Sequence, residues 1–285
     1  MNNTRKNRIK DEAFKYFGIF CTLLGLLLLA LFIGNILIKG LARIDWDFIT
    51  GLPSRFPERA GIFSAFMGTL WMMFLTGFIA IPLGVSAAIY LEEYSKKSRM
   101  GNILELNISN LAGVPSIIYG ILGLEVFSRT MHLGGSVLAG SLTLALLILP
   151  IIIVATREAI KAVPSTIREG SYALGASKWQ TIWLQLLPTA SGGIITGIIL
   201  ALARAIGEAA PLVVAGAMVY VPFAPSSPMD EYSVLPIQVF NWISRPQKGF
   251  EINAAAGIII LLAITFIMNG IAVYFRNRMQ KKLKW

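Results

Sequence analysis

The chain has 285 residues, of which 55% are hydrophobic and 14% are charged, against about 45–50% and about 25% in soluble domains. This composition excludes an ordinary soluble domain and predicts a bundle of membrane helices. Because the chain has one cysteine, Cys21, and one histidine, His132, a disulfide within the chain and a histidine-based metal or catalytic centre are excluded as well. We expect no metal, no cofactor and no catalytic residue.

Six apolar runs are long enough to cross a bilayer, which takes about 20 residues each. They cover residues 16–38, 61–91, 106–124, 133–156, 179–218 and 252–275. The first run is far longer than the core of a signal peptide and has no small-residue cleavage site after it, so we expect a retained anchor. The sequence predicts an all-α polytopic membrane protein with six transmembrane helices.

The basic residues indicate the orientation of these helices. If the N-terminus is cytoplasmic, most of the 25 Lys and Arg residues fall on the cytoplasmic side. They are Arg5, Lys6, Arg8, Lys10, Lys15, Lys96, Lys97, Arg99, Arg157, Lys161, Arg168, Lys178, Arg276, Arg278, Lys281, Lys282 and Lys284. An excess of Lys and Arg marks cytoplasmic loops. We therefore expect both termini in the cytoplasm, and the net charge of +10 needs no nucleic acid to explain it.

Two polar segments are expected on the outer side. Residues 39–60 contain Trp46 and Phe48, which suit a membrane interface, and residues 219–251 are rich in Pro and Ser, with one short helix expected near 234–244. Four spans contain a proline, and these are Pro82, Pro115, Pro150 and Pro211. Each proline frees a backbone carbonyl that a neighbour must satisfy, so the prolines indicate either close packing or a gate.

The cytoplasmic segment 157–188 is expected to begin as a continuation of the fourth span and to break at Pro164. Ser165 or Thr166 can cap a new short helix. That helix would have Glu169 in its first turn, where the positive end of the helix dipole favours an acid.

After this helix, Gly175 permits a sharp bend that a side chain would block. Trp179, Ile182 and Trp183 start the next helix, and at Pro188 the chain is expected to turn toward the membrane. The result is two short helices with an exposed apolar ridge. Such a ridge can dock into the groove of a partner or lie on the lipid surface as an amphipathic pair.

Four residues of this segment fit the pattern E-x5-G-x9-I-x-L-P. They are Glu169, Gly175, Leu187 and Pro188. The pattern resembles the cytoplasmic loop motif of bacterial ABC importer permeases. The chain departs from it at Gly170 and Ser171, where Ala-Ala is usual, and at Gln185, where Ile is usual; Gly and Ser are small enough for the same packing. The resemblance implies a type I ABC importer permease fold, and a loop that docks as a coupling helix into a groove on an ATPase subunit.

Four further stretches carry a closer resemblance. They are PSRFPERAGIFSAFMGTLW at 53–71, IPLGVSAAIYLEEY at 81–94, GVPSIIYGILGL at 113–124 and LARAIGEAAPL at 202–212. They are similar to the PstA-type phosphate permeases. This resemblance implies a tail, first span and outer linker at 1–60, and a permease domain at 61–285 that contains the coupling loop 157–188.

The same resemblance implies an assembly in the bacterial inner membrane. Its expected partners are two copies of an ATPase subunit, a second permease of the PstC type and an extracytoplasmic phosphate-binding protein, with inorganic phosphate as the substrate. This chain would form half of the translocation pathway. The pathway would open alternately to the two sides of the membrane as ATP closes the ATPase dimer and the coupling loops move.

The chain has no G-x-x-x-x-G-K-[ST] loop for ATP and no G-x-S-x-G or H-E-x-x-H motif. We therefore expect a transport subunit rather than an enzyme, with ATP hydrolysis on a separate subunit. Two other functions remain open. One is a permease for another oxyanion, such as sulfate or molybdate, and the other is an ion-coupled secondary transporter, which would leave the 157–188 motif unexplained.

Arg204 lies about midway along the fifth run, and Glu208 follows one turn later. An Arg at the centre of a membrane helix costs about 2.5–3.5 kcal/mol on insertion scales, which makes such a residue a candidate for function. We expect Arg204 to line the pathway and meet the anion with its planar fork, while Glu208 holds it at rest. The alternative is that the pair only stabilises the bundle.

Small residues crowd the same run, and they are Gly193, Gly197, Ala201, Ala203, Ala205, Gly207, Ala209 and Ala210. Small residues let helices approach closely, so they indicate either a subunit interface around the pore or a contact within the chain. Glu125 and Arg129 repeat the four-residue spacing near the outer edge, where we expect an exposed surface pair.

Overall fold

The computed structural model describes residues 2–95, 99–218 and 220–282. Within these ranges the regular structure is helical, apart from one isolated bridge between Ser136 and Glu231. The all-α prediction is therefore confirmed. Lys96, Lys97 and Lys284, which the sequence assigns to the cytoplasmic side, lie outside the described residues.

Five helices carry most of the chain. They are α1 (Asn2–Gly40), α3 (Phe63–Ile89), α6 (Val137–Lys161), α9 (Leu187–Ile206) and α12 (Gly249–Lys282). The shorter helices are α2 (Trp46–Thr50), α4 (Arg99–Leu111), α5 (Ser116–Gly123), α7 (Ser165–Ala173), α8 (Lys178–Thr181), α10 (Ala210–Ala215) and α11 (Leu235–Ile243). Short 3₁₀ turns lie at Leu41–Arg43 and Pro57–Arg59, and π-helical segments at Tyr90–Tyr94, Leu124–Thr130 and Ile182–Leu186.

Five stretches are long and apolar enough to cross a membrane, and a sixth is a bent pair of helices. The continuous stretches are Lys10–Arg43, Phe63–Tyr94, Val137–Lys161, Lys178–Ile206 and Gly249–Arg278. The bent pair is Ile103–Leu111 with Ser116–Thr130, and its two parts meet at 102°. The predicted third span, 106–124, is therefore present as a bent pair of helices. It bends because Pro115 has no N–H to donate and disfavours helical backbone at the residue before it.

The fifth predicted span, 179–218, is also divided. Its helix ends at Ile206, and the short helix α10 follows after a break. Pro211 lies in the first turn of α10, where its missing N–H would have had no helical partner. Gly216 ends α10 with a φ of +108°, a backbone conformation that glycine adopts without strain.

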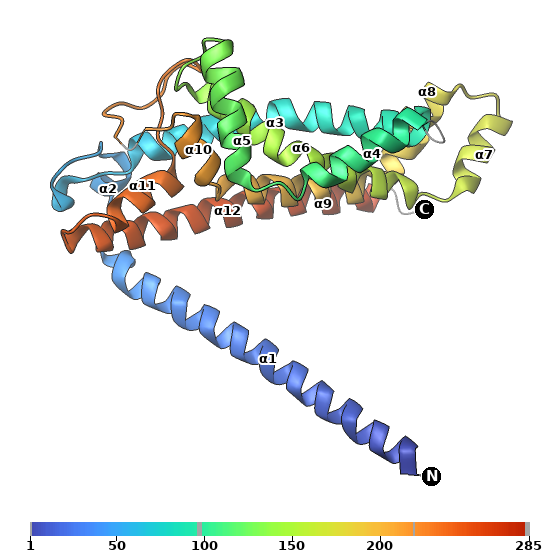
Figure 1. Ribbon diagram of the computed structural model, residues 1–285, viewed down its shortest axis with the longest axis horizontal. Helices are drawn as coiled ribbons and strands as arrows, with labels where there is room; N and C mark the ends of the chain where they lie inside the picture. Colours follow the sequence, from blue (N-terminus) through green and yellow to red (C-terminus); the bar gives the residue numbers. More distant parts are fainter. Residues whose placement is uncertain (1, 96–98, 219, 283–285) are drawn as a thin grey trace.

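Helices α3, α6 and α9 pack side by side along the long axis of the molecule, and α12 packs on α9 (Figure 1). Small residues make the closest contacts. A Cβ on Gly193 would lie 2.6 Å from the Cβ of Ala159, and a Cβ on Gly197 would lie 2.3 Å from the Cβ of Ala155. These two glycines of α9 therefore serve a contact with α6 inside the chain.

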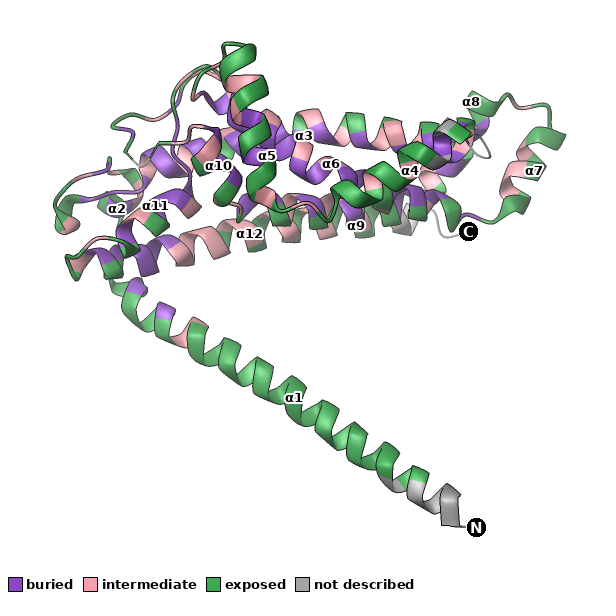
Figure 2. Cartoon of the chain, viewed as in Figure 1, coloured by how far each residue is buried: buried purple, intermediate pink, exposed green. Residues whose placement is uncertain are grey.

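Helix α1 stands apart from the other long helices (Figures 1 and 2). Its described side chains are exposed along most of its length, and it contacts α12 at its C-terminal end, where a Cβ on Gly40 would lie 2.7 Å from backbone atoms of Ala255 and Ala256. Along the long axis of the molecule, α1 and α12 both run toward the end that carries α7 and α8, although α1 diverges from the other helices on the way (Figure 1). This placement agrees with the prediction that both termini lie on the side of the coupling loop.

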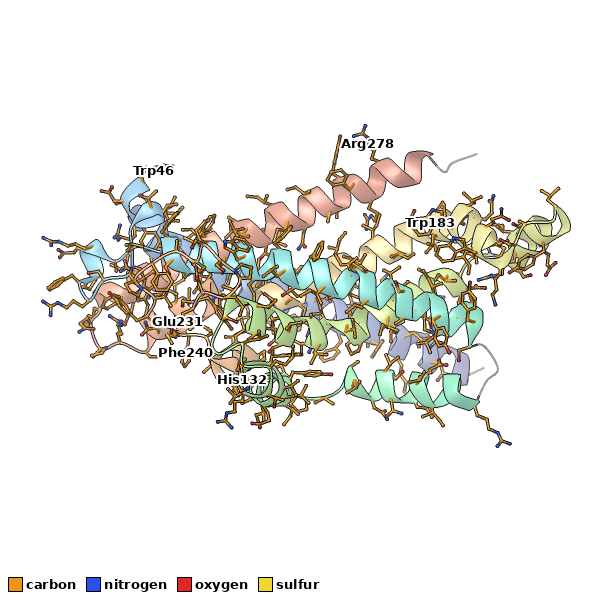
Figure 3. All side chains as sticks on the ribbon, turned by 90° about the horizontal axis from the view of Figure 1, so that it is seen from above. Trp46, His132, Trp183, Glu231, Phe240 and Arg278 are labelled. Carbon is orange, nitrogen blue, oxygen red and sulfur yellow. The ribbon has the colours of Figure 1, made fainter. Side chains whose placement is uncertain are left out.

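The opposite end of the molecule carries α2 and α11. Trp46 is exposed there, as expected of an interfacial tryptophan, and Figure 3 shows it far from Trp183 of the coupling loop. Phe48 is instead fully buried, with its ring 5.7 Å from that of Trp242. The predicted short helix near 234–244 is confirmed as α11.

Candidate coupling loop and ion pair

The coupling loop 157–188 leaves the end of α6 and enters α7 just after Pro164. Pro164 itself is the residue before the helix, so neither Ser165 nor Thr166 caps it with a side chain. Glu169 consequently lies in the middle of α7 rather than in its first turn, and its side chain is exposed. The predicted capping arrangement is wrong, because the fixed φ of proline already sets the entry to the helix.

The bend after α7 has the predicted glycine. Gly175 has a φ of +82°, and a Cβ added to it would have nothing within 4 Å, so backbone conformation rather than space requires glycine here. Ser177 then starts α8 with a capping box, in which its hydroxyl accepts from the N–H of Gln180 and the Gln180 side chain accepts from the N–H of Ser177. The S-x-x-Q spacing signals such a box in a sequence, and our sequence reasoning missed it.

An exposed apolar surface covers this loop, as expected. Its members are Tyr172, Leu174, Trp179, Trp183 and Leu184, and Leu174 is 90% exposed. Trp179 and Trp183 stack with their ring centroids 5.8 Å apart. Ile182 does not belong to this surface, because it is buried against Ile160 and Leu186.

Pro188 does not mark a turn. The chain runs as one helix from Lys178 to Ile206, with Pro188 in the first turn of α9. The π-helical segment Ile182–Leu186 precedes it. A proline inside an α-helix clashes with the carbonyl four residues earlier, and the wider π turn accommodates it. Leu187 and Pro188 are half-buried, while Leu186 is the buried anchor.

Two grooves flank the loop. One, of about 540 Å³, lies between α3 and the helix from α8 to α9 and includes Pro82, Tyr90, Trp179 and Trp183. The other, of about 510 Å³, lies between α7 and the same helix and includes Gly170, Leu184 and Pro188. Both leave the loop surface open to a partner.

Arg204 lies in the last turn of α9, and Glu208 lies beyond the end of that helix. The Arg204 Nε and the Glu208 Oε1 are 3.5 Å apart, and the Arg204 side chain is 43% exposed. The expectation of an Arg at mid-span is therefore wrong, because the predicted span is divided at Gly207. A cation at a helix C-terminus is favoured by the helix dipole, which lowers the cost of placing Arg204 there.

Helix α10, which follows this pair along the chain, packs on α5 of the bent span. Helix α5 approaches α10 closely, since a Cβ on Gly120 would lie 2.6 Å from the carbonyl oxygen of Pro211. The bent span and the segment after Arg204 therefore lie against each other.

Glu125 and Arg129 form the predicted exposed pair, with 3.0 Å between Oε2 and Nη1.

The outer segment also contains an acidic side chain held by local hydrogen bonds. Asp230 Oδ2 accepts from the backbone N–H groups of Ser226 and Ser227, and from the hydroxyl of Ser226. These bonds lower the pKa of the Asp230 carboxyl below its ordinary value because they favour the charged form. Within the described residues, no group of three His, Cys, Asp or Glu side chains could hold a metal ion.

The sequence matches known proteins along most of its length. Residues 80–281 match the family described as "Binding-protein-dependent transport system inner membrane component". The chain is 30% identical over 279 residues to the "Probable ABC transporter permease protein YqgI" of Bacillus subtilis (strain 168), covering 94% of this chain and 95% of that protein. It is 30% identical to the "Phosphate transport system permease protein PstA" of Xylella fastidiosa (strain Temecula1), covering 96% of both.

Similar figures hold for the "Phosphate transport system permease protein PstA 1" of Mycobacterium tuberculosis (strain CDC 1551 / Oshkosh), with 30% identity and coverage of 96% and 90%. The structure resembles a chain of the MetNI methionine ABC transporter in its inward-facing conformation. The TM-score is 0.61 at 17% sequence identity, over 74% of this chain and 93% of that one. This likeness shows the fold.

Proposed function

Because the chain belongs to the family of binding-protein-dependent transport system inner membrane components, we propose that it is the PstA-type permease subunit of an ATP-driven phosphate importer. It is an ABC importer permease of the inner membrane, with the type I fold, and not an enzyme. Its family works with a separate ATPase and a substrate-binding protein. Phosphate as the substrate is supported by the PstA relatives.

The single observation that carries the proposal is the placement of Arg204. Its guanidinium is partly exposed, and one carboxylate, that of Glu208, lies 3.5 Å from it. A guanidinium fork binds phosphate oxygens bidentately. Glu208 competes with the anion for Arg204, so a bound phosphate can be released when the pathway opens to the other side.

The coupling loop supplies the proposed link to the ATPase. Glu169, Gly175, Leu187 and Pro188 match the motif positions, and the apolar surface with Leu174 at its tip is exposed. An exposed apolar helix surface next to a groove fits helix-in-groove docking. ATP-driven closure of the ATPase dimer would then move α7 and, through it, the pathway.

Two further partners complete the proposal. The exposed side of Arg204 needs a second permease of the PstC type to close the pathway around it, with this chain contributing its domain 61–285. The outer segments 39–60 and 219–251 would receive the phosphate-binding protein. If two different permeases form the pathway, this chain needs to contribute only half of the anion site.

The test is uptake of labelled phosphate in cells that lack this gene, complemented with wild type, Arg204→Gln or the control Arg129→Gln. Arg129 forms an exposed pair of matching spacing, so its variant controls for loss of a surface charge. We expect wild type and Arg129→Gln to restore uptake, phosphate but not sulfate or molybdate to compete, and Arg204→Gln to reach the membrane without transporting. Competition by sulfate or molybdate would assign another oxyanion, and uptake independent of the ATPase would contradict the proposal.

A further inference from the structure

Two successive acidic residues, Glu92 and Glu93, lie where α3 ends at the cytoplasmic side. They belong to the π-helical segment Tyr90–Tyr94. Their side chains are 2% and 9% exposed. Neighbouring residues on a helix point in different directions, about 100° apart in an α-helix and somewhat less in a π-helix, so the two carboxylates reach different parts of the molecule.

The first carboxylate contact joins α3 to the coupling loop. Glu93 Oε1 accepts from Nε and Nη2 of Arg168 at 3.2 and 3.1 Å. Arg168 also donates to the carbonyl oxygens of Ile160 and Val163, both at 3.0 Å. Arg168 of α7 thus satisfies carbonyls at the end of α6 and holds α3 with the same guanidinium.

The other end of the loop meets the same turn. The Lys178 ammonium, at the start of α8, donates to the backbone carbonyl of Glu93 and lies 4.5 Å from the centroid of the Tyr94 ring. A cation at this distance from an aromatic face is attracted to it. Both arms of the coupling loop are therefore attached to Tyr90–Tyr94.

The second carboxylate contact reaches the bent span. Arg157 of α6 lies 3.6 Å from Glu92 Oε2 and 3.0 Å from Glu105 Oε1 of α4. The Arg157 side chain is nearly buried. Helix α4 leads through the 102° bend to α5, and α5 packs on α10, which follows Arg204.

We propose that Glu92 and Glu93 form a clamp that transmits movement of the coupling loop to α3 and, through Arg157 and Glu105, to the bent span beside Arg204. This inference rests on the proposed function of the loop as the ATPase contact. If two buried charges separate, each is left without its counter-charge in a medium of low dielectric, which is strongly destabilising. The elements that carry the two charges therefore move together. A pair whose two side chains are both exposed can exchange its partner for water and transmits little. Glu105 is 43% exposed, but its partner Arg157 is only 11% exposed.

The clamp is tested in the full complex, reconstituted with its ATPase and binding protein, by measuring phosphate transported per ATP hydrolysed. Glu93→Gln removes the charge and keeps the shape. We expect the variant complex to assemble and to hydrolyse ATP, while transport per ATP falls about tenfold, the size of a typical coupling between sites. Glu158→Gln is the matched control, because it breaks an exposed 2.9 Å pair with Lys161 on the neighbouring helix turn, and its ratio should stay at the wild-type value.

A double-mutant cycle with Arg168→Gln separates transmission from general damage. If Glu93 and Arg168 act as one unit, the double variant should be no worse than the worse single variant; additive losses would overturn the clamp. Arg168→Lys gives a second measurement should Glu93→Gln fail to assemble, since it keeps the charge but loses the fork, and a wild-type ratio there would also overturn it. A wild-type complex without substrate-stimulated ATP hydrolysis would instead overturn the proposed function, and the clamp with it.

Discussion

Gly197 of α9 lies against Ala155 of α6 so closely that a Cβ on Gly197 would be 2.3 Å from the Cβ of Ala155. Helix α6 enters the coupling loop and α9 leaves it. The two helices that frame the loop are thus held together over their length by small residues. Movement of the loop must displace them as a pair.

We predict that Gly197→Ala destabilises the protein. The new methyl group must push α6 and α9 apart, and overpacking of this kind costs about 1–3 kcal/mol. Gly270→Ala is the control, because a Cβ on this glycine of α12 has nothing within 4 Å and alanine is the better helix former. Thermal unfolding in detergent should show a lower Tm for the first variant and an equal or higher Tm for the second. Equal Tm values for wild type and Gly197→Ala would contradict the packing argument.

Loss of the hydroxyl is expected to have different effects on the free energy of unfolding at two buried tyrosines. The Tyr119 hydroxyl donates to the carbonyl of Leu111 at 2.7 Å, across the bend between α4 and α5. The Tyr232 hydroxyl is buried and has no hydrogen-bond partner among the described residues, and burial raises the pKa of its phenol. Tyr119→Phe should therefore lower the free energy of unfolding by about 1 kcal/mol, whereas Tyr232→Phe should leave it unchanged or raise it. Denaturation of the two variants side by side checks this, and a larger loss for Tyr232→Phe would contradict it.

Hydropathy predicted the all-helical fold well, because a run of some 20 apolar residues is a signal averaged over many positions. It could not reveal where the runs break. Residues 106–124 read as one span, yet Pro115 divides it, whereas Pro82 and Pro150 remain inside continuous helices. Only the neighbours that satisfy the freed carbonyls decide between these outcomes.

The candidate site shows the same limit. The pair of Arg204 and Glu208 and the bend at Gly175 could be predicted from the sequence, because each depends only on residues that are close together in the chain. Arg168 and Glu93 are 75 positions apart, and no periodicity links them. A single sequence shows the charges but not which ones meet.

The exposed tip of the coupling loop gives a direct prediction for the ATPase contact. Leu174→Gln should leave the permease folded, because Leu174 makes few contacts at 90% exposure. It should weaken binding of the ATPase subunit about tenfold, or about 1.4 kcal/mol, since burying a leucine side chain in a partner's groove contributes about 1.5–3 kcal/mol relative to leaving it exposed. Met229→Gln, an exposed apolar residue of the outer segment, is the control and should bind as wild type. Unchanged affinity for Leu174→Gln would move the contact elsewhere on the loop.

If the ion pair of Arg204 and Glu208 lies in the pathway, removing the Glu208 carboxylate should change both the KM for phosphate and the maximal uptake rate. Glu208→Gln removes the carboxylate that competes with phosphate for the guanidinium, so phosphate should be held more tightly and released more slowly. We expect both KM and the maximal uptake rate to fall, by about tenfold each if the competition is worth about 1.4 kcal/mol. Glu125→Gln, which breaks an exposed pair of the same spacing, should change neither. If the pair served only to stabilise the bundle, Glu208→Gln would lower the amount of folded protein and the maximal rate in proportion, at an unchanged KM; a lowered KM therefore distinguishes a residue of the pathway from a structural one.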